Sequence, residues 1–188
     1  MNAMLRVSAL DSDKRVPTVL GSRASHMTND TTSLITSRSE FHAALRAAFG
    51  EAAAAGTREI WLCDEDFADW PLGERAVIDD LTRWATSSRR LTLIARDFDE
   101  LVRRHPRFVT WRRHWAHIVS CRANTEIATG EMPTLLVAAG TVNVRLSDAI
   151  HHRGRWSHQA ADELRCQEQI DAILQRSAES FPATTAGL

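Results

Sequence analysis

The chain has 188 residues, which is enough for one domain of ordinary size and too few for two domains with separate cores. Hydrophobic residues make up 44% and charged residues 25%, as in a soluble globular protein, and the longest apolar run, Leu135 to Ala139, is too short to cross a bilayer. The formal net charge of −1 gives no global attraction to nucleic acid or to an anionic membrane. We therefore expect no membrane insertion, and any electrostatic role has to be local.

The N-terminal part of the chain differs from the rest. Residues 1–37 are rich in Ser, Thr, Asp and Arg and show no sustained hydrophobic period, which predicts a flexible extension before a domain over residues 38–188. Translation can start at Met1 or at Met27. No apolar core of a signal peptide is present, because charged residues interrupt the first apolar stretch at Asp11. The three cysteines are far apart and form no C-x-x-C pair, so we expect free thiols and a cytoplasmic protein.

Helical and strand-like segments alternate through the remaining chain. A helix is expected from a Ser39 cap to a stop at Gly56, a second from about Glu74, short ones at Asp99–Arg104 and from Pro106, and a long one after a Ser157 cap. The segments expected as buried strands are apolar runs of four or five residues: Glu59–Cys63, Leu91–Ala95, Ile118–Cys121, Thr134–Ala138 and Val142–Leu146.

This order predicts the fold class. Helices that alternate with apolar strands favour an α/β fold with a mainly parallel sheet and helices on both faces. The last two strands flank Gly140 at hairpin spacing, which adds an antiparallel hairpin late in the chain.

The hairpin segment and the order of elements resemble one half-domain of the phospholipase D-like superfamily. In that superfamily the motif H-x-K-x4-D-G crosses the first hairpin strand. Here the stretch Met132 to Gly140 has the same frame, with Met132, Thr134 and Ala139 at the positions of the histidine, lysine and aspartate. The loop Trp70 to Glu74 and the ending Gln175 to Thr185 are also similar to an uncharacterised bacterial family of that fold.

This resemblance implies a catalytically silent domain with a degenerate HKD motif. A thioether cannot act as the nucleophile in place of an imidazole, and without the lysine there is no point charge to hold the phosphate. We therefore expect no catalytic residue of that type, no metal and no cofactor. The domain is expected to act as a binding or assembly module, and because one half of a two-half fold normally pairs with another, as a homodimer.

Two segments keep an enzymatic alternative open. Asp64 and Asp66 follow a buried strand, where open α/β sheets place their ligands, and carboxylates there could serve a phosphodiesterase or phosphatase. The cluster His151, His152 and Arg153 could serve the same chemistry.

The strongest local charge bias lies between residues 101 and 125, which contain no acidic residue. Its arginines could bind phosphate groups or nucleic acid, which makes nucleic acid or an anionic ligand a possible partner. Alternatively, the arginines pair internally with Asp64, Asp66, Asp69 and their neighbours. The candidate binding residues are Arg103, Arg104, Arg107, Arg112 and Arg113.

Overall fold

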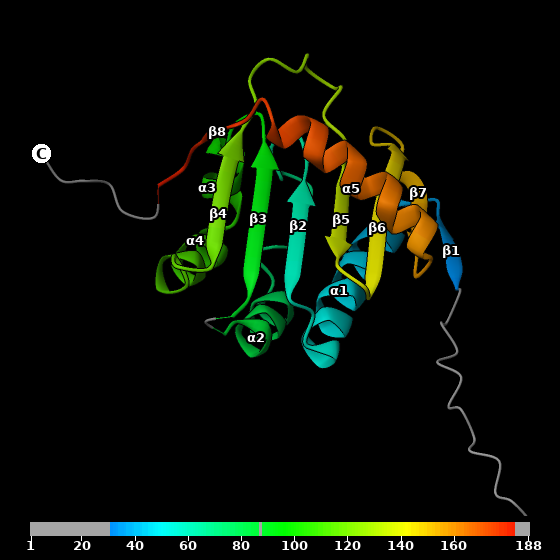
Figure 1. The fold of residues 1–188 in the computed structure, drawn as a ribbon, viewed down its shortest axis with the longest axis horizontal. Coiled ribbons are helices and arrows are strands. Elements are labelled where there is room, and N and C mark those ends of the chain that lie inside the picture. The colour runs from blue at the N-terminus through cyan, green and yellow to red at the C-terminus, as the bar shows by residue number, and fades with distance from the viewer. Residues whose placement is uncertain (1–30, 87, 183–188) are drawn as a thin grey trace, which may run out of the picture.

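A computed structural model describes residues 31–86 and 88–182. Within them, eight strands form one mixed sheet with helices on both faces (Figure 1). The strands are β1 (Thr32–Ile35), β2 (Glu59–Cys63), β3 (Arg90–Ala95), β4 (Val119–Ala123), β5 (Leu135–Ala138), β6 (Val142–Asp148), β7 (Arg153–Ser157) and β8 (Ala178–Glu179). The helices are α1 (Arg38–Ala55), α2 (Arg75–Trp84), α3 (Asp99–Arg104), α4 (Pro106–His114) and α5 (Ala160–Leu174).

The strand order is β1-β7-β6-β5-β2-β3-β4-β8. Only β2 with β3 and β3 with β4 pair in parallel, through crossovers that contain α2 and then α3 and α4. The other five pairs are antiparallel. The expectation of a mainly parallel sheet is therefore wrong: the described sheet is mixed and mostly antiparallel.

The connections between the strands after β4 make most of the sheet antiparallel. Short turns join β5, β6 and β7, and short turns only allow antiparallel neighbours. β5 then enters the sheet antiparallel to β2, and β1 and β8 add antiparallel edges. The predicted hairpin around Gly140 is thus one turn of a longer antiparallel meander.

Local signals account well for the first helix. The Ser37 hydroxyl, rather than that of Ser39, accepts a hydrogen bond from the Glu40 backbone N–H at 3.3 Å and caps α1. The helix ends at Gly56, whose φ of 66° lies in the left-handed region that glycine adopts without strain. At the other end of the chain, Gln159 rather than Ser157 precedes α5, because Ser157 is the last residue of β7.

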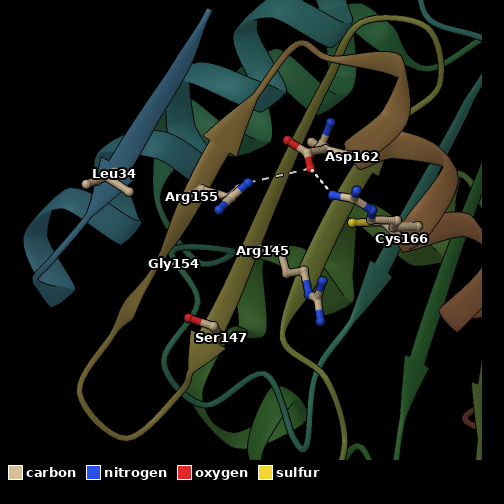
Figure 2. A pocket seen from close by; sticks show the side chains of 9 residues that line it. Leu34, Arg145, Ser147, Gly154, Arg155, Asp162 and Cys166 are labelled. Carbon is tan, nitrogen blue, oxygen red and sulfur yellow. Dashed lines mark hydrogen bonds and ion pairs between the residues drawn. The ribbon is translucent and has the colours of Figure 1, made fainter.

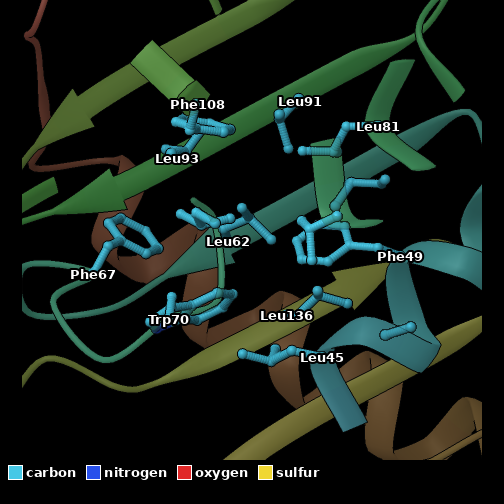
Figure 3. Close-up of a cluster of buried hydrophobic side chains, with 14 of the residues drawn as sticks. Leu45, Phe49, Leu62, Phe67, Trp70, Leu81, Leu91, Leu93, Phe108 and Leu136 are labelled. Carbon is cyan, nitrogen blue, oxygen red and sulfur yellow. The ribbon is translucent and has the colours of Figure 1, made fainter. Parts of the chain in front are cut away.

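The two faces of the sheet carry separate hydrophobic clusters. The larger one lies under α1, α2 and α4 and joins their apolar faces to alternate residues of the strands, such as Leu62 and Leu93 (Figure 3). The smaller one lies under α5, which crosses the other face over β5 and β6 (Figure 1). Because α5 covers only part of its face, the polar residues of β6 and β7 on that side lie beside the helix and not beneath it.

The last residues of the predicted flexible extension belong to the folded sheet. Residues 32–35 were expected within a flexible segment and instead form β1, which pairs antiparallel with β7. Neither β1 nor β7 shows an apolar run, because both lie near the edge of the sheet and keep exposed residues. Residues 1–30, with both candidate start residues Met1 and Met27, lie outside the described residues. In the part of the chain that is described, no helix is long and apolar enough to cross a membrane.

Candidate functional site

The loop after β2 forms one wall of a cavity of about 270 Å³, here called the acidic pocket. Its opposite walls come from the segment before β5 and from the β6–β7 connection. The acidic loop, residues 64–69, and His152, which are more than 80 residues apart in sequence, therefore meet in one cavity. The functional groups that line it are Asp64, Glu65, Asp66, Asp69, Thr134 and His152.

Asp64 is the most buried carboxyl group of this pocket. Its Oδ1 accepts a hydrogen bond from the Thr134 hydroxyl at 2.5 Å, and its Oδ2 accepts one from the Phe67 backbone N–H at 2.8 Å. Burial raises the pKa of Asp64, and these hydrogen bonds oppose the shift only in part. Asp64 therefore fastens the loop to Thr134, the residue before β5.

His152 and Asp69 form the second polar pair of the acidic pocket. His152 has a φ of 51°, an uncommon conformation for a residue other than glycine, and its Nε2 lies 3.7 Å from Asp69 Oδ2. Asp69 also pairs with Arg38 at 2.8 Å. His151 points elsewhere, because its Nδ1 lies 2.8 Å from Asp148 Oδ2 on the exposed β6–β7 connection. Of the predicted histidine cluster, only His152 reaches the pocket.

The three positions of the HKD frame do not form one site. Met132 and Thr134 line the acidic pocket, whereas Ala139 follows β5 at its far end, where its N–H donates to the Glu59 carbonyl. Thr134, at the position of the lysine, donates a hydrogen bond to Asp64 and carries no positive charge that could hold a phosphate. Over residues 31–86 and 88–182, no group of three or more His, Cys, Asp or Glu side chains converges to hold a metal ion.

The predicted basic segment is divided among several environments. Glu100 pairs with both Arg103 and Arg104, at 2.5 and 2.8 Å, and this lowers the pKa of Glu100 to about 2. Arg107 donates to the Gly73 carbonyl at 3.2 Å. Arg112 is buried, and Arg113, one residue later, is exposed. Of the five predicted binding residues, Arg112 is thus enclosed in the fold, and the other four keep exposed side chains.

The expected pairing of these arginines with Asp64 and Asp69 is wrong. Asp69 pairs with Arg38 and Asp64 binds Thr134, while Glu65 pairs with Arg96 at 3.4 Å. The Arg112 guanidinium donates to the Phe181 carbonyl and lies 4.1 Å from the centroid of the Phe181 ring. Its role is to fasten the C-terminal segment to α4.

A second cavity, of about 290 Å³, lies beside α5 on the partly covered face of the sheet and is here called the basic pocket (Figure 2). Strand alternation builds it: the even-numbered residues of β6 enter the larger core, and the odd-numbered ones face the pocket. Helix α5 contributes residues spaced three and four apart, which lie on one helical face. The polar residues that line it are Asn143, Arg145, Ser147, Arg155, Asp162 and Arg165.

The charges of the basic pocket are unbalanced. Arg145 and Arg155 are directly opposite each other in the β6–β7 register. Asp162 Oδ1 lies 3.7 Å from an Arg155 nitrogen and 3.3 Å from an Arg165 nitrogen, as the dashed lines in Figure 2 mark. Arg145 has no ion-pair partner within the described part of the chain, and its Nε is buried without a hydrogen-bond partner there. The pocket therefore holds three guanidinium groups and one carboxylate, and only Arg155 and Arg165 lie near that carboxylate.

The sequence does not predict this pocket, because the residues that line it are far apart along the chain. Its three arginines are spaced over 21 residues and come from two strands and a helix. The alternation of polar and apolar residues from Val142 to Ser147 is the one available signal, since it indicates a strand with a polar face. The partner strand β7 was not predicted, so nothing placed Arg155 opposite Arg145.

Comparisons with known proteins show the fold and no family. No family model matches the chain, and no curated protein matches it. Among solved structures the chain is similar to TrmBL2, an archaeal chromatin protein whose structure shows a novel mode of DNA binding. The TM-score is 0.55 at 12% identity, and the match covers 79% of this chain and 54% of that chain.

These findings correct the family prediction. The resemblance to a phospholipase D-like half-domain with a degenerate HKD motif is not supported, since no such family model matches and the solved structure described above is that of a chromatin protein. The nine-residue frame at Met132 to Gly140 was too short to carry a family assignment, because apolar strands followed by a glycine turn are common in unrelated folds.

Proposed function

We propose that this protein is a binding module for a ligand that carries an oxyanion, and that the basic pocket is its binding site. The observation that carries the proposal is the opposition of Arg145 and Arg155 on neighbouring strands with a single shared carboxylate nearby. Like charges directly opposite on paired strands destabilise a sheet. A phosphate or carboxylate bound between them removes this repulsion, and the planar guanidinium group matches both anions.

The chemistry of the pocket supports binding over catalysis. Arginine stays protonated at all ordinary pH values and cannot act as a general base. The cysteine of the pocket, Cys166, is buried, and burial raises the pKa of its thiol, which keeps it from forming a nucleophilic thiolate. The pocket can hold an anion without reacting with it. TrmBL2, whose fold is similar, binds DNA, a ligand rich in phosphate, and this agrees with an oxyanion as the class of ligand.

Calorimetric titration with inorganic phosphate and with sulfate tests the proposal. The variant Arg145→Ala should weaken phosphate binding by about tenfold or more, since a hydrogen bond to a charged group contributes about 1.5–3 kcal/mol. The matched control is Arg153→Ala, which removes an exposed arginine from the same sheet that does not line the pocket. Absence of binding in the wild type, or equal losses in both variants, would refute the proposal.

An enzymatic function in the acidic pocket is the second candidate. It is favoured by the convergence of Asp64, Asp66, Asp69 and His152 on one cavity. Carboxylates repel a phosphoester unless a metal ion neutralises them, and no metal-binding group occurs among the residues described. We expect no hydrolysis of bis-p-nitrophenyl phosphate with Mg²⁺, Mn²⁺ or Zn²⁺. Turnover that disappears in His152→Ala would instead establish a phosphodiesterase.

A homodimer is a further proposal. Its support is β1, an edge strand that pairs on one side only within the described sheet. Leu34 at this edge is 75% exposed. Unpaired backbone groups and an exposed apolar side chain on an edge strand favour pairing with a second chain.

A further inference from the structure

The basic pocket contains two buried acceptors in addition to its arginines. Asn143 is 2% exposed, and its Oδ1 has no hydrogen-bond donor among the described residues. Asp162 is 7% exposed, and its Oδ2 has no donor there either, although its Oδ1 lies near two arginines. Buried acceptors without donors are rare in folded proteins because they are costly. A ligand that carries a hydroxyl donor beside its negative charge would pair with these acceptors as well as with the arginines.

This requirement narrows the class of ligand. A phosphate dianion and a carboxylate offer acceptors only, so they satisfy Arg145 and leave Asn143 Oδ1 unpaired. A hydroxyl group supplies the missing donor without adding a charge. A phosphate ester of a polyol combines both, and a cavity of about 290 Å³ lies at the small end of ligand-binding pockets.

The same features argue against a nucleic-acid strand in this pocket. Asn143 is almost fully buried, so only a small molecule that enters the cavity can reach its amide. Asp162 occupies Arg155 and Arg165, which leaves Arg145 alone without an ion-pair partner in the described residues, and a single free guanidinium group matches one phosphate rather than a row of them. A DNA phosphodiester also carries no hydroxyl group beside the phosphate. Asp162 and Asn143 thus select against the ligand class that arginines alone would attract.

We propose that the basic pocket binds the phosphate ester of a small polyol, with the phosphate at Arg145 and hydroxyl groups donating to Asn143 Oδ1 and Asp162 Oδ2. This inference rests on the proposed anion-binding function and adds the part of the ligand that the arginines do not contact. Arg155 and Arg165 hold Asp162 in place and share the charge of the phosphate.

A titration series on the full chain tests this inference. The probes are inorganic phosphate, glycerol 3-phosphate, ribose 5-phosphate, ribose without phosphate, and a short single-stranded DNA. We expect at least one polyol phosphate to bind at least tenfold more tightly than inorganic phosphate, and ribose not to bind. Equal affinity for phosphate and both esters overturns the inference and leaves anion binding intact. Binding of DNA in preference to the esters, lost in Arg145→Ala, overturns it in favour of nucleic acid.

A substitution at the acceptor provides the second test. Asn143→Leu removes the amide at nearly constant volume, so the advantage of the esters should fall to within about threefold of phosphate while phosphate affinity stays the same. Ser147→Ala is the matched control, since Ser147 lines the same pocket but its hydroxyl already donates to the Arg153 carbonyl at 3.2 Å. An unchanged ester advantage in Asn143→Leu counts against the proposed hydroxyl contact. Should this variant fail to fold, the wild-type series alone still decides, and absence of phosphate binding in it refutes the proposed function as well.

Discussion

Two adjacent arginines of α4 have opposite environments and allow a matched test of the buried contact with the C-terminal segment. Arg112 is 4% exposed, donates to the Phe181 carbonyl and lies over the Phe181 ring. Arg113 is exposed. The variants Arg112→Ala and Arg113→Ala change the net charge equally, so any difference between them reports the buried contact.

The magnitude follows from the contacts that are lost. A hydrogen bond to a charged donor contributes about 1.5–3 kcal/mol, and a partly desolvated cation–π contact about 1 kcal/mol. Removing the guanidinium also relieves its desolvation, including that of the buried Nε, which has no partner in the described residues. We expect a net loss of about 2 kcal/mol for Arg112→Ala and less than about 0.5 kcal/mol for Arg113→Ala.

The assay is thermal and urea denaturation of both variants and the wild type. For a chain of this length, about 2 kcal/mol corresponds to a decrease in Tm of about 4–8 °C. Hydrogen exchange should also become faster over residues 177–182 in Arg112→Ala alone, because Arg112 fastens this segment. Equal stability of the two variants would refute the reasoning and indicate that Arg112 is not held against Phe181.

Three further predictions concern the pockets and assembly. Burial raises the pKa of Asp64 in the folded protein, so the protonated carboxyl group stabilises the fold below the pKa of the unfolded chain, and this contribution is lost as pH rises through the folded pKa. Asp64→Asn should therefore raise Tm relative to wild type more at pH 8 than at pH 4. A difference in Tm that is independent of pH contradicts this prediction. Gly154→Ala should lower the free energy of unfolding by about 3 kcal/mol, because the new Cβ would lie 2.1 Å from the Arg145 carbonyl oxygen. Gly130→Ala, where nothing lies within 4 Å of the new Cβ, should lower it by about 1 kcal/mol. Equal losses in Tm would show that β7 can move aside. Light scattering at micromolar concentration should report about twice 21.0 kDa, and a monomer at all concentrations excludes the proposed homodimer.

Several elements were predictable because their signals are local. The strand Glu59–Cys63 and the helix Asp99–Arg104 both have their predicted bounds. Helix α1 ends at Gly56 as predicted, because glycine tolerates the left-handed conformation that this end requires. The three cysteines are free, as expected, and the structure buries all of them. Central strands and amphipathic helices bury contiguous or periodic apolar residues, so their sequences carry the pattern.

The edge strands and both pockets were not predictable in the same way. β7, with the sequence RGRWS, is partly exposed and has no apolar run, so its place beside β6 depends on a turn geometry that composition does not indicate. The basic segment was the strongest local bias, and the fold distributes it over Glu100, a backbone carbonyl and a buried contact with Phe181. The densest run of arginines along the chain therefore lies outside the basic pocket, in which positive charges outnumber negative ones.

The sequence by itself determined the helices, the central strands and their alternation, because hydrophobic periodicity and capping act within a few residues of the chain. Only the tertiary structure decided which strands run antiparallel, that Asp64 and His152 share a cavity, and that Arg145 lies opposite Arg155. These relations depend on strand order and register, which are set by packing between segments distant in sequence. The residues of both pockets are far apart along the chain, and for that reason the candidate sites become visible only in three dimensions.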